Sequence, residues 1–196
     1  MKTADPGHGR RLVLVRHSLP DISRGVPAAQ WPLSALGTAR AVAFARELDP
    51  GSARTVFTSE EPKAMQTATA LASAWRLDVQ AVPGLQEHER PQAQMLSRDQ
   101  FEDRIRTMFA KPGDLVFGAE TANAARRRFT TALMRLFVRS AEDVIVVSHG
   151  TVITLFVAEA TGVDPFTFWK KLDMPCAVTL GVPELHLRGE PVRLPS

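Results

Sequence analysis

Cysteine is almost absent from this chain of 196 residues, which contains a single one, Cys176. One cysteine cannot form an internal disulfide, and it supplies no CxxC pair for a metal ion. The sequence is therefore compatible with a reducing compartment, and we expect a cytoplasmic protein in which Cys176 is a small buried residue.

Long apolar runs are also missing, since no stretch approaches the length needed to span a bilayer. The first residues include Lys2, Asp5 and Pro6 but lack the apolar segment of a secretory signal peptide. We expect a soluble protein without a membrane partner, in which residues 1–11 form a flexible leader.

The chain has little net charge of either sign: 24 Lys and Arg residues against 21 Asp and Glu residues give a formal charge of +3. This excess is too small to indicate a nucleic-acid partner, and the basic run Arg126–Arg128 is typical of a solvated helix face. One of these arginines could instead support a functional site or contact Glu120. The phosphate-binding loop motif GxxxxGK[ST] is absent as well.

What the sequence does contain is a regular alternation of short apolar strands with longer amphipathic helices. This alternation predicts one domain over residues 1–196, folded as a three-layer α/β/α sandwich. Serines 34, 59 and 97 are the predicted N-caps of three helices. We expect strands at 12–15, 55–58, 77–82 and 144–147, two or three short strands within 177–194 with a hairpin turn at 188–190, and helices at 34–48, 59–75, 97–110, 120–140 and 152–161.

Two of the predicted strands run directly into a histidine. Leu12–Val15 is followed by Arg16 and His17, and Val144–Val147 is followed by Ser148 and His149. Apolar runs without alternation are typical of parallel strands covered on both faces, and ligands in open α/β sheets bind outside the carboxyl ends of such strands. We therefore expect both histidines at the same edge of the sheet.

Several blocks of the chain, in this order, resemble the histidine phosphatase superfamily, which also contains the cofactor-dependent phosphoglycerate mutases. The resemblance implies a mixed, mainly parallel six-stranded sheet. Two positions depart from the family pattern: Ser18 stands where Gly or Ala is usual, and Lys63 replaces the second phosphate-binding arginine. The matching blocks are Arg16-His17, Pro32–Gly37, Ser59–Ala68, Glu87, Gly118–Thr121 and Ser148–Gly150.

The resemblance implies a phosphomonoesterase that acts through a phosphohistidine on His17, with Glu87 as the proton donor. Arg16, Lys63 and His149 would bind the phosphate. The residue chemistry agrees, because a neutral imidazole is a good nucleophile and an arginine matches two phosphate oxygens. A protonated His149 could bind a third oxygen. With three positive groups we expect no metal and no other cofactor, and the partner would be a small phosphomonoester or inorganic phosphate.

Some alternatives stay open at this stage. A histidine at a strand end is often only structural, and Glu89 competes with Glu87 as the proton donor. The chain could be a mutase that transfers phosphate, or a phosphate-binding regulatory domain without turnover. Lys63 keeps the second alternative open, because a lysine lacks the bidentate geometry with which an arginine binds phosphate. The loops at 20–32 and 87–117 would select the substrate. The sequence does not identify that substrate or the oligomeric state.

Overall fold

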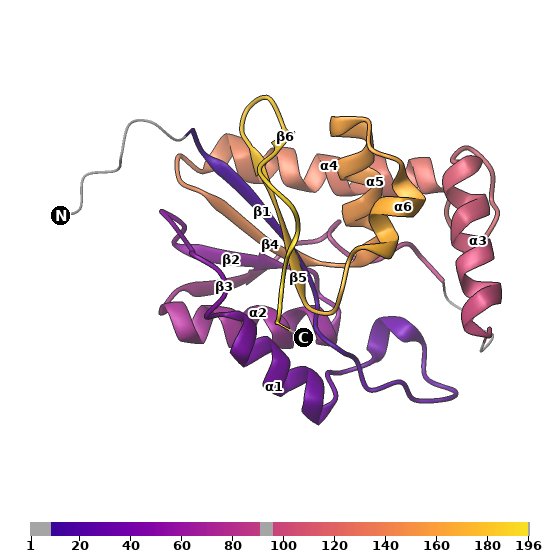
Figure 1. Cartoon of the computed structure of the whole chain (residues 1–196), viewed down its shortest axis with the longest axis horizontal. Coiled ribbons are helices and arrows are strands. Elements are labelled where there is room, and N and C mark those ends of the chain that lie inside the picture. The colour runs from indigo at the N-terminus through magenta and orange to yellow at the C-terminus, as the bar shows by residue number, and fades with distance from the viewer. Residues whose placement is uncertain (1–8, 91–95, 196) are drawn as a thin grey trace.

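The computed structural model describes residues 9–90 and 96–195, in which one central sheet lies between two layers of helices (Figure 1). The strands are β1 (Arg11–Arg16), β2 (Thr55–Thr58), β3 (Asp78–Ala81), β4 (Val144–Ser148), β5 (Cys176–Gly181), β6 (His186–Leu187) and β7 (Val192–Arg193). The helices are the short 3-10 helix η1 (Ala28–Gln30), α1 (Ala35–Phe44), α2 (Pro62–Trp75), α3 (Arg98–Ala110), α4 (Ala122–Arg139), α5 (Gly150–Thr161) and α6 (Pro165–Lys170).

The sheet has the strand order β3-β2-β4-β1-β5-β6, and β7 also pairs with β5. The first four strands are mutually parallel, whereas β5 runs antiparallel to β1. The expected mixed, mainly parallel sheet and the α/β/α architecture are confirmed. The described part of the chain has seven strands, one more than the resemblance implies but in agreement with the two or three short strands expected within 177–194. The predicted hairpin turn at 188–190 is wrong: β6 and β7 both pair with β5, so this segment only interrupts one edge of the sheet.

The core lies on both faces of the sheet, as the unalternating apolar strands predict. In β1, Leu12 and Leu14 pack into the cluster under α3, α4, α5 and α6, while Val13 and Val15 pack into the cluster under α1 and α2. Burial on both faces removes nearly all of the apolar area of these side chains from water, which is the main favourable term in folding. β1 is therefore a rigid base for the residues that follow it.

Two of the three serines predicted to be helix N-caps are confirmed in that role. Ser34 accepts a hydrogen bond from the Gly37 N–H, and Ser97 forms the predicted capping box with Gln100. The prediction that Ser59 caps a helix is wrong, because α2 starts at Pro62 and its N-cap is Glu61. The Ser59 N–H donates to the Val147 carbonyl at 3.0 Å, so the chain continues along the sheet past β2. α1 also ends earlier than expected, and α5 begins earlier.

Of the predicted leader at 1–11, residues 1–8 lie outside the described residues. Arg11 is the first residue of β1, and its guanidinium is 2.9 Å from the Asp143 carboxylate. Within 9–90 and 96–195, no helix is both long enough and apolar enough to cross a membrane.

Candidate active site

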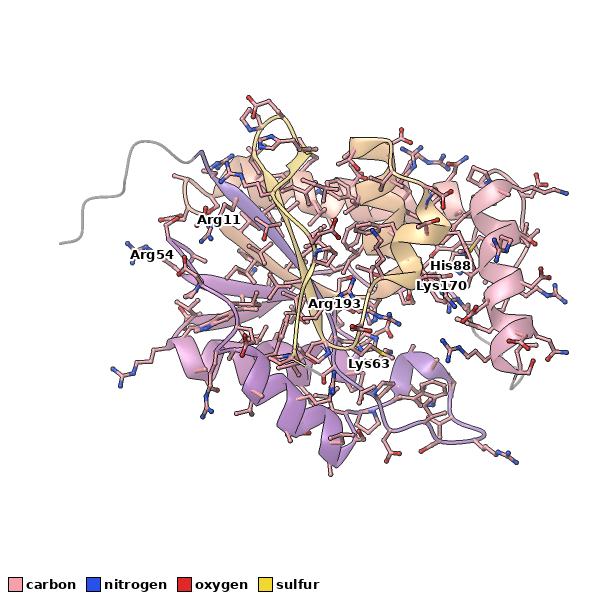
Figure 2. The ribbon with its side chains drawn as sticks, viewed as in Figure 1. Arg11, Arg54, Lys63, His88, Lys170 and Arg193 are labelled. Atoms are coloured by element: carbon pink, nitrogen blue, oxygen red, sulfur yellow. The ribbon has the colours of Figure 1, made fainter. Side chains whose placement is uncertain are left out.

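The two histidines that follow β1 and β4 meet at the carboxyl edge of the sheet. β1 and β4 are neighbours, and the His17 N–H donates to the Ser148 carbonyl at 2.9 Å. The ring centroids of His17 and His149 are 5.1 Å apart, and both side chains are buried. Figure 2 shows Lys63 and His88 toward this end of the sheet, while Arg11 and Arg54 lie toward the other.

The hydrogen bond of the His17 ring decides which of its nitrogens carries the proton. Nδ1 lies 2.7 Å from the Ser18 carbonyl oxygen. A carbonyl can only accept, so Nδ1 carries the hydrogen and Nε2 keeps its lone pair. Burial lowers the pKa of His17 well below its usual value, and the nearby His149 and the Arg16 charge lower it further. His17 is thus neutral, as a nitrogen nucleophile must be.

The segment around Ser18 is fixed from below by α1 and α2. The Ser18 N–H donates to Thr67 Oγ1 at 3.0 Å, and its hydroxyl donates to the Gly37 carbonyl at 2.7 Å. A Cβ on Gly37 would lie 2.0 Å from the Leu19 carbonyl oxygen, so only glycine allows this approach. The departure from the family at Ser18 therefore adds a hydrogen bond that holds the His17 segment in place.

Arg16 lies behind the site, against the start of α5. It donates a short hydrogen bond from Nη1 to the Leu172 carbonyl, while its buried Nε has no partner among the described residues. A Cβ on Gly150 would lie 3.0 Å from Nε and 3.1 Å from Cζ. Gly150 therefore leaves the space that the guanidinium occupies.

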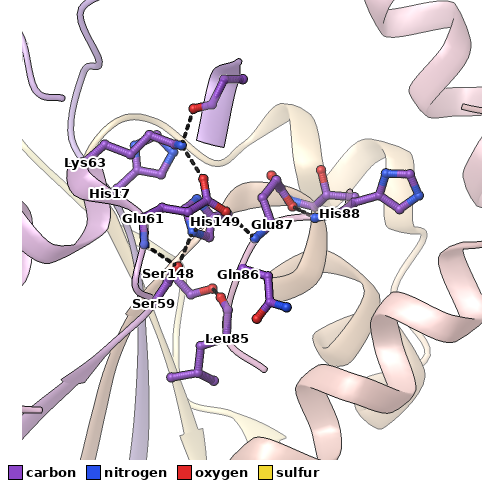
Figure 3. A network of polar contacts seen from close by, with 12 residues as sticks. His17, Ser59, Glu61, Lys63, Leu85, Gln86, Glu87, His88, Ser148 and His149 are labelled. Carbon is purple, nitrogen blue, oxygen red and sulfur yellow. Dashed lines mark hydrogen bonds and ion pairs between the residues drawn. The ribbon is translucent and has the colours of Figure 1, made fainter. Parts of the chain in front are cut away.

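Lys63, the residue that replaces the family arginine, is buried and already has two partners. Its ammonium donates to the Ala28 carbonyl of η1 at 2.7 Å and forms a short ion pair with Glu61 (Figure 3). The loop at 20–32 therefore lies against the site, as the sequence analysis expects of a loop that selects the substrate. The Lys63 charge is largely compensated by Glu61, a residue to which the sequence analysis assigns no role in the site.

Glu61 lies in the middle of the polar network (Figure 3). One carboxylate oxygen pairs with Lys63, and the other accepts the Glu87 N–H at 2.8 Å and lies 3.4 Å from His149 Nε2. Burial raises the pKa of Glu61 despite the opposing Lys63 charge. This carboxylate therefore touches three of the groups that surround the two histidines.

His149 is fully buried as the N-cap residue of α5. Its Nε2 lies 2.9 Å from Ser59 Oγ, and its Nδ1 has no hydrogen-bond partner in the described part of the chain. Burial and the charges of Lys63 and Arg90 lower its pKa well below the usual value. The lowered pKa disfavours the protonated form of His149, which the sequence analysis considered as a phosphate-binding group, even though the Glu61 carboxylate lies 3.4 Å from Nε2.

Glu87 points its carboxylate at the first turn of α5. The two oxygens accept the His88 N–H at 2.9 Å and the Thr151 N–H at 3.2 Å, and Arg90 Nη2 is 3.8 Å away. Burial by itself raises the pKa of this carboxyl, but the Arg90 charge and the two N–H donors outweigh it, so the pKa is lowered. The expected protonated Glu87 is thus not the resting state, which is a carboxylate.

The other candidate acid, Glu89, is exposed, and its contacts are made by its backbone: the N–H donates to Glu120 Oε1 at 3.0 Å, and the carbonyl accepts the Ala119 N–H at 2.8 Å. Glu87 instead connects through its own N–H to Glu61 and, through Glu61, to Lys63 and His149. The geometry therefore favours Glu87 over Glu89.

Arg90 is a site residue that the sequence analysis missed. Its guanidinium lies 5.3 Å from the ring centroid of Phe101 and 5.1 Å from that of Phe117, and it donates to Thr151 Oγ1 at 2.7 Å. Flanking aromatic rings stabilise a cation and fix its plane. The spacing of Glu87 and Arg90 was the only signal in the sequence, and it is too common to identify such a residue.

Arg128 resolves the open question about the basic run on α4. It donates to the carbonyls of Gly84, Gln86 and Glu87 at 2.9, 2.9 and 3.1 Å, and to Glu120 at 2.6 Å. Arg128 therefore holds the backbone that presents Glu87. Arg127 is exposed, as a solvated helix face would be.

Within 9–90 and 96–195, no group of three or more His, Cys, Asp or Glu side chains is arranged to hold a metal ion. The charged groups around the two histidines are the cations Arg16, Lys63 and Arg90 and the carboxylates of Glu61 and Glu87. Such a mixed set, next to a neutral imidazole with a free lone pair, can bind an anion and transfer protons.

Comparison with known proteins agrees with this arrangement. The family model described as the histidine phosphatase superfamily (branch 1) matches residues 12–185. No curated protein matches the chain. Among solved structures, the mycobacterial glucosyl-3-phosphoglycerate phosphatase in complex with inorganic phosphate is similar, with 24% identity, a TM-score of 0.68 and coverage of 91% of this chain and 94% of that chain. The alpha-ribazole phosphatase from Shigella flexneri has 23% identity and a TM-score of 0.70 and covers 93% of this chain and 95% of that chain. At these identities the similarity concerns the fold.

Proposed function

Because the chain belongs to the histidine phosphatase superfamily, we propose that it hydrolyses a small phosphomonoester through a phosphohistidine formed on His17. The observation that carries the proposal is the state of His17: a neutral ring with Nδ1 tied to the Ser18 carbonyl and the lone pair on Nε2. A merely structural histidine has no need of a free nitrogen beside three cations.

In the first step, His17 Nε2 attacks phosphorus, the P–N bond forms and the bond to the leaving oxygen breaks. Arg16, Lys63 and the Nε2–H of a neutral His149 stabilise the negative charge on the phosphoryl oxygens. Arg90 adds a fixed positive charge beside Glu87. These residues supply the charge stabilisation that a metal ion would otherwise provide, so the proposed activity is metal-independent.

Glu87 moves the proton in both steps. As an acid it protonates the leaving oxygen, and as the resulting carboxylate it takes a proton from the water that attacks the phosphohistidine, releasing inorganic phosphate and free His17. Its lowered pKa fits the second step directly. For the first step the carboxyl must hold a proton, so only the fraction of molecules in which Glu87 is protonated can donate it.

Two of the similar structures are named as phosphatases of glucosyl-3-phosphoglycerate and of alpha-ribazole. We propose a substrate of the same general kind, a small molecule with one terminal phosphate, selected by the loops at 20–32 and 87–117.

The test is the release of phosphate from an aryl phosphate by the wild type and by His17→Ala, with and without a chelator. We expect turnover that the chelator leaves unchanged and the substitution abolishes. Rapid quenching should trap a phosphoenzyme that is labile to acid and stable to alkali, as a P–N bond is. Phosphate binding without turnover would support the regulatory-domain alternative, and isomerisation of phosphoglycerate that depends on a bisphosphorylated primer would support the mutase.

A further inference from the structure

The Glu61 carboxylate contacts groups to which the proposed function assigns the phosphate. It forms an ion pair with the Lys63 ammonium, accepts a hydrogen bond from the Glu87 N–H at 2.8 Å and lies 3.4 Å from His149 Nε2. Lys63 and His149 are two of the three groups assigned to the phosphate. A carboxylate and a phosphate seek the same donors, so Glu61 acts as an internal anion in this site.

The surroundings of Glu61 make the two anions incompatible. Glu61 is buried, with 8% of its surface exposed, so water screens little of the repulsion between its charge and a phosphate that contacts the same donors. Two anionic groups that contact the same buried donors disfavour each other's ionisation, which favours a proton on one of them. The charged and titratable groups that face Glu61 are Lys63 on α2, His149 at the start of α5, and Glu87 and Arg90 on the segment after β3.

The charge balance of the site supports the same conclusion. The cations Arg16, Lys63 and Arg90 are opposed by the carboxylates Glu61 and Glu87, and both histidines are neutral. Arg128 also acts on His149, but its charge is compensated by Glu120 at 2.6 Å. The excess is one positive charge, which matches a singly charged anion better than the dianion of a phosphate. Neutralising one carboxylate would match the site to the dianion. Glu61 is the better placed of the two, because burial already raises its pKa whereas that of Glu87 is lowered.

We propose that Glu61 competes with the substrate phosphate for Lys63 and His149, and that the phosphate binds only together with a proton that neutralises the Glu61 carboxylate. The proton comes from solvent and forms one O–H bond, so no other group changes its charge. The neutral carboxyl can then donate this hydrogen to a phosphate oxygen. Glu61 would therefore determine the pH range in which the site binds phosphate. This inference rests on the proposed function.

The experiment measures the binding of inorganic phosphate by calorimetry at about pH 8.5, where most phosphate is the dianion. Titrations in two buffers of different ionisation enthalpy give the number of protons taken up. We expect uptake of about one proton in the wild type and about one fewer in Glu61→Gln, which should bind phosphate about tenfold more tightly because the competing charge is gone.

Glu60→Gln is the matched control, because it removes the same charge from the adjacent, exposed position. It should bind phosphate like the wild type. A second measurement on the wild type avoids dependence on the variant: phosphate addition should produce the infrared carbonyl band of a protonated carboxyl, which Glu61→Gln should lack and Glu60→Gln should retain.

The outcomes separate this inference from the proposed function. If the wild type hydrolyses an aryl phosphate but takes up no proton and shows no new carboxyl band, the inference is overturned and the proposed function stands. Weaker phosphate binding in a folded Glu61→Gln protein would overturn it as well, because Glu61 would then only position Lys63. If the wild type neither binds inorganic phosphate nor hydrolyses an aryl phosphate, both the inference and the proposed function are overturned.

Discussion

The rings of His17 and His149 meet edge to face, with their centroids 5.1 Å apart, at the ends of two adjacent parallel strands. Both rings are buried, and the pKa of each is lowered, first by burial and then by neighbouring groups. Two neutral imidazoles therefore face each other in a region that also contains three cations. In the proposed reaction one of these rings is the nucleophile and the other is a hydrogen-bond donor.

Replacing Glu87 should affect substrates according to their leaving group. Glu87→Gln removes the proton donor, so hydrolysis of an alkyl phosphate should slow by about 10²- to 10⁴-fold, while an aryl phosphate with an acidic leaving group should lose far less. Glu89→Gln is the control, because Glu89 is exposed and should leave both rates unchanged. The comparison is made on kcat for both substrates. Equal losses for the two substrates in Glu87→Gln would contradict the assignment.

Lys63 should contribute to phosphate binding despite its ion pair with Glu61. Lys63→Met should lower kcat/KM by about 10²-fold, the usual effect of removing one donor to the transition state. Lys63→Arg should retain at least the wild-type value, because a guanidinium can bind Glu61 and phosphate with different nitrogens. Lys171→Met serves as a control at an exposed lysine outside the two loops proposed to select the substrate. Unchanged kcat/KM in Lys63→Met would show that this lysine only anchors the loop at 20–32.

Arg128 should position Glu87 without taking part in the chemistry. Arg128→Ala leaves three carbonyls of the 84–87 segment and the Glu120 carboxylate without their donor. We expect the free energy of unfolding to fall by about 2–4 kcal/mol, since each unsatisfied polar group is costly.

The leaving-group test distinguishes positioning from general destabilisation in this variant. Misplaced Glu87 should slow alkyl phosphate hydrolysis more than aryl phosphate hydrolysis, whereas partial unfolding would reduce both equally. Arg127→Ala, at the exposed neighbouring position, is the matched control for the change of charge and should behave like the wild type.

The stability of the protein should fall as the pH drops below about 6.5, the ordinary pKa of histidine. The pKa of His149 is lower in the folded state than in the unfolded chain. Between these two pKa values the unfolded chain binds more protons than the folded protein does. The free energy of unfolding therefore decreases as the pH falls through this range. The slope for one such histidine is at most about 1.4 kcal/mol per pH unit.

Urea denaturation of the wild type and His149→Gln at several pH values between about 8 and 5 checks this prediction. The variant should be less stable at pH 8, because it loses a buried contact, but its stability should depend less steeply on pH. Parallel curves for the two proteins would contradict the lowered pKa of His149.

The sequence alone was sufficient to predict the fold class and to place the residues that follow the two central strands. Unalternating apolar runs are typical of strands covered on both faces, and residues directly after such strands must lie at the carboxyl edge of a parallel sheet. Arg16, His17 and His149 could therefore be assigned to one place. The capping serines 34 and 97 were predictable because a cap is a local interaction: their hydrogen bonds reach only three residues along the chain.

The tertiary structure decided what depends on contacts between distant segments. Ser59 looks like a helix cap in the sequence but lies against His149, and Glu61 looks like a helix-start carboxylate but lies between Lys63 and the Glu87 N–H. The protonation states of His149 and Glu87 could not be predicted from the sequence, because a pKa depends on burial and on charges that other strands and helices contribute. Sequence determines which groups are available, whereas only the packed structure determines their charge and their partners.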